Sequence, residues 1–257
     1  MRKFANPLKD LCYLAYRWIE PVADPIKAVK SVPGYLAYWL DWIHYARLDG
    51  AEAIRLGDTY PRLHDKTENT PFDSHYFYQD LWAFKKIRES GVEWHVDVGS
   101  RIDLIGFLTA VCKVTFVDIR PLKAALDNFE SIKGSILSMP YPENSILSLS
   151  CLHVAEHIGL GRYGDTLDPF GTRNACAELS RILASNGDLY FSLPIGKPRL
   201  CFNAHRIHSP RQILDYFAGL ELTDFSVIDD NRAFRENVDY RDFDSATYAC
   251  GLFHFKK

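Results

Sequence analysis

Three side chains that could do chemistry lie close together in the segment SCLHVAEHIGLG, residues 150–161. They are His153, Glu156 and His157. On a helix, spacings of three and four residues would place them on one face, where they could converge on one ion or substrate. One class of zinc peptidases uses the same HxxEH order, with two histidine ligands and the glutamate as general base. The segment is therefore either a metal site or part of a pocket for another ligand.

The rest of the chain argues against the zinc peptidase. A third ligand would have to come from a later helix, and Glu178 follows only about twenty residues later, on a helix expected to cover the back of a sheet. Gly159 and Gly161 would end a helix early, whereas these peptidases keep the motif inside a long one. We therefore expect no metal site and keep the HxxEH zinc peptidase as a remote alternative.

Composition excludes several classes of protein. The chain has 257 residues, with 30 basic and 33 acidic side chains and a formal net charge of −3, so no bulk positive field indicates a nucleic-acid partner. Its six cysteines include no CxxC pair, which favours reduced thiols over a disulfide framework. No apolar run approaches the roughly 20 residues that span a bilayer. These features predict a soluble, cytoplasmic protein.

The pattern of apolar and polar residues changes near residue 90. This change predicts two regions, a helical N-terminal extension over 1–90 and an α/β domain over 91–257. In the second region short apolar runs alternate with helical periods, as in a parallel sheet with crossover helices. We expect strands at 93–99, 113–119, 145–151, 188–194, 221–229 and 246–255. Helices are expected at 102–112, 121–132, 172–187 and 209–220.

The N-terminal region is rich in aromatic residues. Residues 34–48 predict a mostly buried helix, and 73–91 predict a helix capped by Asp73 or Ser74 and stopped by Gly91. An apolar stripe near the start is expected to pack on its own domain, although a peripheral membrane or protein contact stays open. The stripe consists of Leu8, Leu11, Cys12, Ala15, Trp18 and Ile19. In SHYFY, residues 74–78, we expect His75, Tyr76 and Tyr78 to contact the core or to cover a bound cofactor.

A nucleotide-binding pattern begins at the first expected strand. That strand ends at Asp97 and Gly99, a helix follows, and the next strand ends at Asp118. In doubly wound folds the glycine allows the ligand to approach the backbone, and the acid after the second strand hydrogen-bonds the ribose hydroxyls. The pattern predicts a nucleotide-like cofactor at this end of the sheet.

This order of elements resembles that of the class I S-adenosylmethionine-dependent methyltransferases, and the resemblance is more specific in the segments that follow. GSILSMPYPENSILSLSCLHVAEHI, residues 134–158, is similar to the family's adenine turn, fourth strand and Glu-His-Ile segment. CAELSRILASNGDLYFSLP and the terminal YACGLFHFKK resemble its later helix, fifth strand and last antiparallel strand. The resemblance implies an α/β, Rossmann-like, seven-stranded, mostly parallel sheet with an antiparallel last strand.

Within that superfamily, HVDVGSRID, HIGLGRYGD and FNAHRIHSP most resemble uncharacterised methyltransferase-like proteins, some associated with polysaccharide or cell-surface glycan synthesis.

The resemblance also implies a cofactor site for S-adenosyl-L-methionine. Asp97 and the Gly99–Ser100–Arg101 loop would meet its methionine part, with Arg101 turned outward or paired with the cofactor's carboxylate. Asp118 would bind the ribose, and Ser135 with Ile136 the adenine.

In this context the histidines could activate a methyl acceptor. A hydroxyl needs a base as it attacks, and histidine, with a reference pKa near 6.5, suits that task. His153 is the first candidate and His157 the second, while Glu156 and His157 could instead only orient the loop. We expect methyl transfer to a hydroxyl of a small molecule or glycan precursor. The alternative is a catalytically silent methyltransferase-like scaffold or interaction protein.

Overall fold

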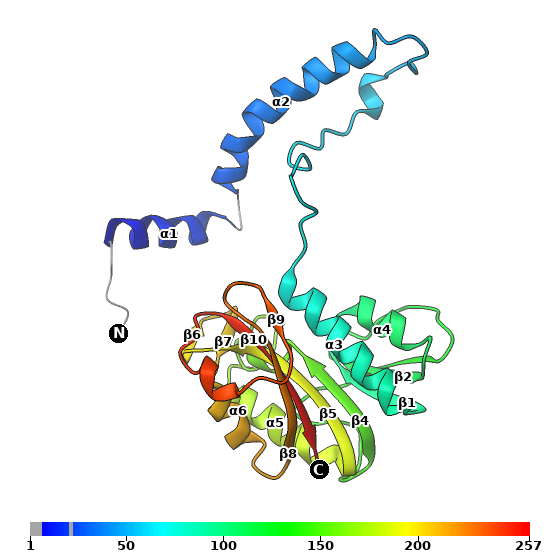
Figure 1. Ribbon diagram of the computed structural model, residues 1–257, viewed down its shortest axis with the longest axis vertical. Coiled ribbons are helices and arrows are strands. Elements are labelled where there is room, and N and C mark those ends of the chain that lie inside the picture. Colours follow the sequence, from blue (N-terminus) through cyan, green and yellow to red (C-terminus); the bar gives the residue numbers. More distant parts are fainter. Residues whose placement is uncertain (1–6, 21–22) are drawn as a thin grey trace. The chain divides into compact units, whose positions relative to one another are not determined.

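The computed structural model describes residues 7–20 and 23–257, which form two compact units, Met1–Pro71 and Phe72–Lys257 (Figure 1). The division at Pro71 differs from the boundary expected at residue 90. Helix α3 (Ser74–Ser90) belongs to the second unit, because Trp82, Ala83 and Ile87 on one of its faces are buried in the core of that unit.

The second unit is built on one twisted sheet of eight described strands in the order β3-β2-β1-β4-β5-β10-β8-β9 (Figure 1). Strands β1 to β5 are parallel, and β10 is inserted antiparallel between β5 and β8. This confirms the Rossmann-like, mostly parallel sheet with an antiparallel last strand, to which β9 adds a two-residue edge. The bounds are β1 Trp94–Val98, β2 Lys113–Asp118, β3 Phe129–Lys133, β4 Ile146–Leu152, β5 Leu183–Ile195, β8 Glu221–Ile228, β9 Phe234–Arg235 and β10 Ala249–Lys256.

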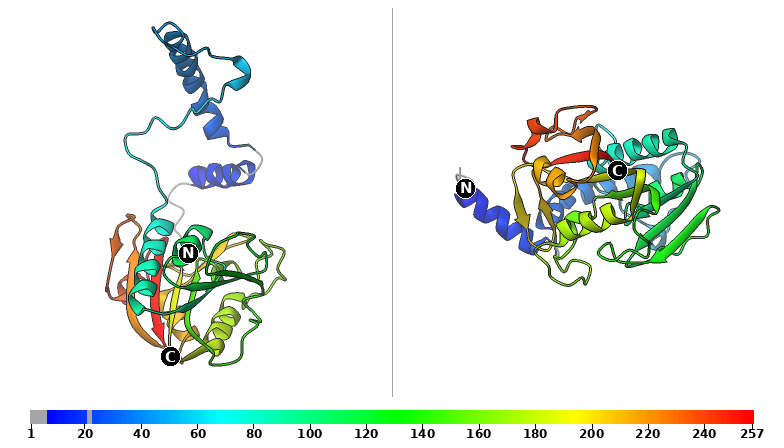
Figure 2. Two further views of the ribbon diagram at one scale, coloured as in Figure 1. Left: turned by 90° about the vertical axis from the view of Figure 1, so that its right-hand side faces the viewer. Right: turned by 90° about the horizontal axis from the view of Figure 1, so that it is seen from below.

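Helices cover both faces of this sheet (Figures 1 and 2). Helices α3 and α4 (Ile102–Leu108) contribute to one apolar cluster, while α5 (Gly171–Ile182) and α6 (Pro210–Tyr216) contribute to the other. Strands buried on both faces are typical of parallel sheets, and the two clusters hold the strand ends in fixed positions. The expected caps at Asp73, Gly91 and Ser209 are present, the last as a full capping box with Gln212.

Several expected elements differ from the structure, and the helices expected at 102–112 and 209–220 end earlier, at Leu108 and Tyr216. The helix expected at 121–132 is wrong: the chain forms a loop after β2 and then β3, which pairs in parallel register with β2. The backbone N–H of Leu122 donates to Ser131 Oγ across this loop. The helix expected at 172–187 ends at Ile182, where β5 begins, and a small hairpin, β6 (Arg199–Cys201) with β7 (His205–Ile207), was not expected.

The N-terminal unit contains α1 (Pro7–Ile19), α2 (Pro25–Tyr45) and the 3-10 turn η1 (Leu56–Asp58). The prediction that 34–48 is mostly buried is wrong, because none of the described residues of α2 is buried. The polar side of α2 is instead held by the unit's own returning segment, through Ser31 to His64 and Asp41 to Lys66. Leu11, Trp18 and Ile19 of the apolar stripe are exposed, and the side chain of Leu8 lies outside the described residues. Among the helices of residues 7–20 and 23–257, none is long and apolar enough to cross a membrane.

Candidate functional site

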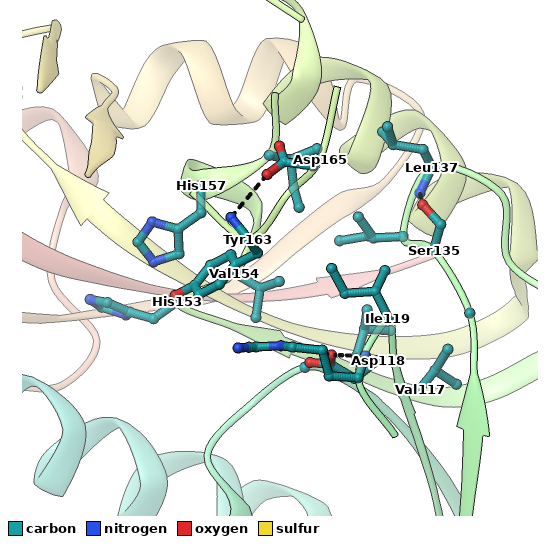
Figure 3. Close-up of a pocket in the computed structure, with 16 residues that line it drawn as sticks. Val117, Asp118, Ile119, Ser135, Leu137, His153, Val154, His157, Tyr163 and Asp165 are labelled. Atoms are coloured by element: carbon teal, nitrogen blue, oxygen red, sulfur yellow. Dashed lines mark hydrogen bonds and ion pairs between the residues drawn. The ribbon is translucent and has the colours of Figure 1, made fainter. Parts of the chain in front are cut away.

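The carboxyl ends of β1 to β4 converge on one cavity, as expected for an open α/β sheet. Its wall includes Gly99 after β1, Asp118 at the end of β2, Ser135 after β3 and His153 after β4. The cavity has a volume of about 110 Å³, which is small for a ligand site, and a second cavity adjoins it. Figure 3 shows His153 and His157 at one end of it and Ser135 with Leu137 at the other.

Gly99 makes the turn between β1 and α4. Its φ of +67° lies in the left-handed region, where a residue with a Cβ is strained. A Cβ here would also come within 3.3 Å of Asp118 Oδ2 and of Val154. The bare backbone of Gly99 therefore leaves space in front of the Asp118 carboxylate.

Asp97 stabilises this turn from the buried side. The carboxylate is fully buried, accepts a hydrogen bond from the backbone N–H of Ser100 (2.9 Å), and accepts another from Ser150 Oγ. Ser150 is in turn 2.8 Å from His95 Nε2. Burial raises the pKa of Asp97 to about 6. Asp97 does not line the cavity, so it shapes the loop that the resemblance assigned to the cofactor's methionine part.

The other cofactor candidates are placed as follows. Asp118 Oδ1 accepts from the backbone N–H of Arg120 at 2.6 Å, and Gly99 faces Oδ2. Ser135 and Ile136 both line the cavity, and Ser135 Oγ accepts from the backbone N–H of Leu137 at 3.2 Å. Val117, Ile136 and Leu137 give this end of the cavity an apolar surface.

Arg101 does not line this cavity, although it lines the more polar one beside it. Its guanidinium lies 2.6 Å from Asp103 and 3.8 Å from Asp80, and packs 5.2 Å from the ring centroid of Tyr76. Two carboxylates already neutralise this cation. Ser100 is also structural in part, because its Oγ accepts from the backbone N–H of Leu152 at the end of β4.

His153 has one nitrogen held and one without a partner. Its backbone has a φ of +55°, and Nδ1 lies 2.7 Å from Gln79 Oε1. Gln79 Oε1 also accepts from Ser192 Oγ at 2.5 Å, so it is an acceptor and His153 Nδ1 carries the proton. Nε2 is buried and has no hydrogen-bond partner. Burial lowers the pKa of His153 to about 3, so the imidazole is neutral and Nε2 has a lone pair.

His157 and Glu156 are more constrained. The 3-10 turn η2 (Ala155–His157) replaces the helix that HxxEH would need to present one face. His157 Nδ1 donates to the carbonyl of Ala204 at 2.5 Å and thereby holds the β6–β7 hairpin, although the ring still lines the cavity. Glu156 is 1 % exposed and lines no described cavity.

The contact between these two residues is not an ion pair at neutral pH. Glu156 Oε1 is 3.6 Å from His157 Nε2, but burial raises the pKa of Glu156 to about 8 and lowers that of His157 to about 4. Both side chains are therefore largely neutral near pH 7.

A second, more polar cavity shares Gly99, Asp118, His153 and His157 with the first. It adds further side chains with hydrogen-bonding or cationic groups: Tyr76, Ser100, Arg101, Lys123 and Arg162. Tyr163 lies between two arginines, 4.5 Å from Arg120 and 5.1 Å from Arg162 by ring centroid. The joined cavities therefore have one apolar end and one polar end.

Sequence reasoning did not single out several of these residues. Gln79 lies in a predicted helix and carries no motif, yet it orients His153 from 74 positions away. Tyr163 and Arg162 belong to the quoted segment HIGLGRYGD, but their spacing alone does not indicate that they reach the cavity. Their role depends on a loop held by Asp165, which accepts from the backbone N–H groups of Gly159 and Tyr163.

Part of the chain is similar to a described protein family. Residues 141–245 match a family described as "Caenorhabditis protein of unknown function, DUF268". No curated protein matches the chain. Among solved structures, the N-methyltransferase NodS from Bradyrhizobium japonicum WM9, in complex with S-adenosyl-L-homocysteine, is 14% identical with a TM-score of 0.48, over 74% of this chain and 89% of that one. Geranyl diphosphate methyltransferase in complex with SAM is 19% identical with a TM-score of 0.47, over 70% and 84%.

Proposed function

We propose that the second unit is an S-adenosyl-L-methionine-dependent methyltransferase that acts on a hydroxyl of a small molecule or glycan precursor. The observation that supports this most strongly is the single cavity at the carboxyl ends of β1 to β4. It joins the Gly99 turn, Asp118, the Ser135–Ile136 turn and His153. These residues come from four separate strand ends, and the sequence resemblance assigns each of them a role toward one cofactor or its acceptor.

The cavity fits the proposed cofactor at three points. Space in front of Asp118, which a Cβ at residue 99 would reduce, lets the carboxylate accept hydrogen bonds from two ribose hydroxyls. Ile136 and Leu137 offer apolar surface for an adenine ring, and the Ser135 hydroxyl lies beside them. The methionine part would follow the Gly99–Ser100 backbone toward the polar cavity, where Arg101 is paired with Asp103.

His153 is the residue that we propose to activate the acceptor. S-adenosylmethionine supplies a methyl group on a positively charged sulfur, which leaves as a thioether while the acceptor oxygen bonds to the methyl carbon. His153 Nε2 can accept a hydrogen bond from that hydroxyl and take its proton as the O–C bond forms. His157 is second, because its Nδ1 is committed to Ala204. Glu156 would support the turn rather than touch the substrate.

The polar cavity supports a polar acceptor. Tyr76, Tyr163 and Arg162 line it beside His153, and hydroxyl and guanidinium groups match the hydrogen-bonding edges of a sugar or another polyhydroxylated molecule. Holding the acceptor here, next to the proposed methyl position, would supply much of the rate by proximity.

Calorimetric titration of the full chain with S-adenosylmethionine and S-adenosylhomocysteine tests the proposal. We expect one site that binds both compounds, and an absence of binding at millimolar cofactor would overturn the function. A second measurement, incubation of cofactor carrying a labelled methyl group with pools of small polar acceptors, separates an enzyme from a silent scaffold. Labelled product is expected only in the first case.

A further inference from the structure

Three potential metal ligands from distant parts of the chain meet beside His153. His75 lies in the first turn of α3, His153 follows β4, and Cys250 is in β10. One donor atom from each lies within 4.8 Å of the other two, and Cys250 Sγ is 3.9 Å from His153 Nδ1. Over residues 7–20 and 23–257, no other three His, Cys, Asp or Glu side chains are grouped in this way.

His153 has two features of a metal-binding histidine: one ring nitrogen is hydrogen-bonded and the other has no partner. Metal-bound histidines normally donate their other ring N–H to a hydrogen-bond acceptor, which fixes the tautomer and the ring orientation. Gln79 Oε1 accepts from His153 Nδ1 in this way, and Ser192 Oγ in turn donates to Gln79 Oε1. The remaining nitrogen, Nε2, is buried and unpartnered, which is costly unless a ligand uses its lone pair.

The other two donors are also restrained. His75 stacks on Tyr248, with ring centroids 5.3 Å apart and planes at 24°, so its ring cannot turn freely. Cys250 is fully buried in the middle of the sheet, where β10 pairs with both β5 and β8. A buried thiol with no disulfide partner next to two imidazoles is a donor set for a soft or borderline cation.

We propose that His75, His153 and Cys250 bind a zinc ion. Zinc binds histidine nitrogen at about 2.0–2.1 Å and cysteine sulfur at about 2.3 Å in a tetrahedron, so its ligand atoms stand roughly 3.3–3.8 Å apart. One donor atom of each side chain already lies within 4.8 Å of the other two, and side-chain rotation would have to bring them closer and turn His153 Nε2, in place of Nδ1, toward Cys250 Sγ. Three protein ligands leave one position open, as in catalytic zinc sites.

This site uses a different set of ligands from the zinc site that the HxxEH motif suggested. His153 is common to both sets, but His157 is committed to Ala204 and Glu156 contributes no donor to the group. The sequence could not indicate the new set, because 78 and 97 residues separate His153 from His75 and from Cys250.

The ion would activate the acceptor hydroxyl in methyl transfer, and this role rests on the proposed function. His153 lines both cavities, so an ion on its Nε2 lies at the wall of the acceptor site. A hydroxyl bound at the open position loses its proton more readily, because the cation stabilises the resulting oxyanion. The proton passes to solvent, the oxygen bonds to the methyl carbon, and the cofactor's sulfur keeps the electrons of the broken bond. His153 would then act through the ion instead of taking the proton itself.

Metal titration of the full chain tests the site without any need for activity. Bound metal is first removed with a chelator, and the protein is then titrated with zinc chloride or cobalt chloride. We expect one ion per chain, and with cobalt an absorption band from charge transfer between thiolate and metal. Cys250→Ser should abolish that band, and His75→Gln should weaken binding by at least tenfold. Gln79→Leu should weaken it roughly 10–100-fold, as for other residues that orient a ligand.

Cys201→Ser is the matched control, because Cys201 lies in the β6–β7 hairpin and does not belong to the group. It should bind metal as the unchanged protein does, and circular dichroism should show that every variant is folded. A folded wild type that binds no zinc, or a Cys250→Ser variant that keeps the cobalt band, would overturn the proposal. S-adenosylhomocysteine binding is measured on the same samples. Cofactor binding without metal rejects only the zinc site, whereas metal binding without cofactor rejects only the proposed function.

Discussion

At the scale of single residues, the Asp118 carboxylate is the most direct test of the cofactor site. Asp118 Oδ2 faces the Gly99 turn, while Oδ1 accepts from a backbone N–H. We expect Asp118→Ala to reduce S-adenosylhomocysteine affinity at least 100-fold, because two charge-assisted hydrogen bonds of about 1.5–3 kcal/mol each are lost. Calorimetry measures the change. Asp127→Ala, in the exposed loop before β3, is the control and should bind normally.

Glu156 predicts a pH dependence of stability. Burial raises its folded-state pKa to about 8 from the ordinary value of 4.5, so the folded protein holds this proton more tightly than the unfolded chain. Stability from this group is full below about pH 4.5 and falls as pH rises toward 8, with a slope approaching about 1.4 kcal/mol per pH unit.

Glu156→Gln should remove that slope, since the amide does not ionise. Urea unfolding from pH 5 to 9 measures it, with Glu143→Gln in an exposed loop as the control. Equal slopes in Glu156→Gln and in the unchanged protein would show that Glu156 is not the group responsible.

At the scale of elements, the proposed function requires that the turn between β1 and α4 leave space for the cofactor. Gly99→Ala adds a Cβ at a φ of +67° and within 3.3 Å of Asp118 Oδ2. We expect a stability loss of about 1–2 kcal/mol from the left-handed backbone, together with at least tenfold weaker cofactor binding.

Gly106→Ala is the counterpart inside α4, where an added Cβ meets no atom within 4 Å. It should leave binding unchanged and stabilise the protein by about 0.5–1 kcal/mol, as a helical glycine replaced by alanine does. Urea unfolding and calorimetry on the two variants give both quantities. If Gly99→Ala binds as tightly as Gly106→Ala, the turn does not contact the cofactor.

The helix at 74–90 shows which features are encoded by neighbouring residues and which are not. The helix at 74–90 was predicted with its caps because Asp73 and Gly91 act through neighbouring backbone groups. Its buried face does not follow from the positions of its apolar residues, since Gln79 is buried while Phe77 and Leu81 are exposed. Burial depends on where the helix meets the sheet, and the helical period alone could not decide it.

At the scale of the whole molecule, the chain divides at Pro71, and the segment before it offers exposed cleavage sites. Arg55, Arg62 and Lys66 lie in or beside exposed loops of the N-terminal unit. Limited trypsin digestion should cut there first and leave a resistant fragment that begins between residues 56 and 67 and runs to the carboxyl end. Mass spectrometry identifies it, and the fragment should retain S-adenosylhomocysteine binding. Early cuts inside 74–257, or a fragment that no longer binds, would place the boundary elsewhere.

The sequence by itself determined most of the sheet and one half of the site. Gly99, Asp118, Ser135 and His153 each follow a parallel strand, and the connectivity of such a sheet brings the carboxyl ends of its strands to one edge. Local strand patterns therefore predict that these residues line one cavity. They did not predict β3, because its pairing with β2 outweighs the helical character of 121–132.

Only the tertiary structure decided what surrounds His153. Gln79 reaches it because α3 packs against the sheet, and Cys250 because β10 is inserted between β5 and β8. Contacts between residues 74 and 97 positions apart leave no periodic signal in the chain. They arise from the way the helices and the last strand bury their apolar faces. Of the HxxEH motif, that packing leaves His153 with an unpartnered Nε2 and places its ring beside the buried thiol of Cys250.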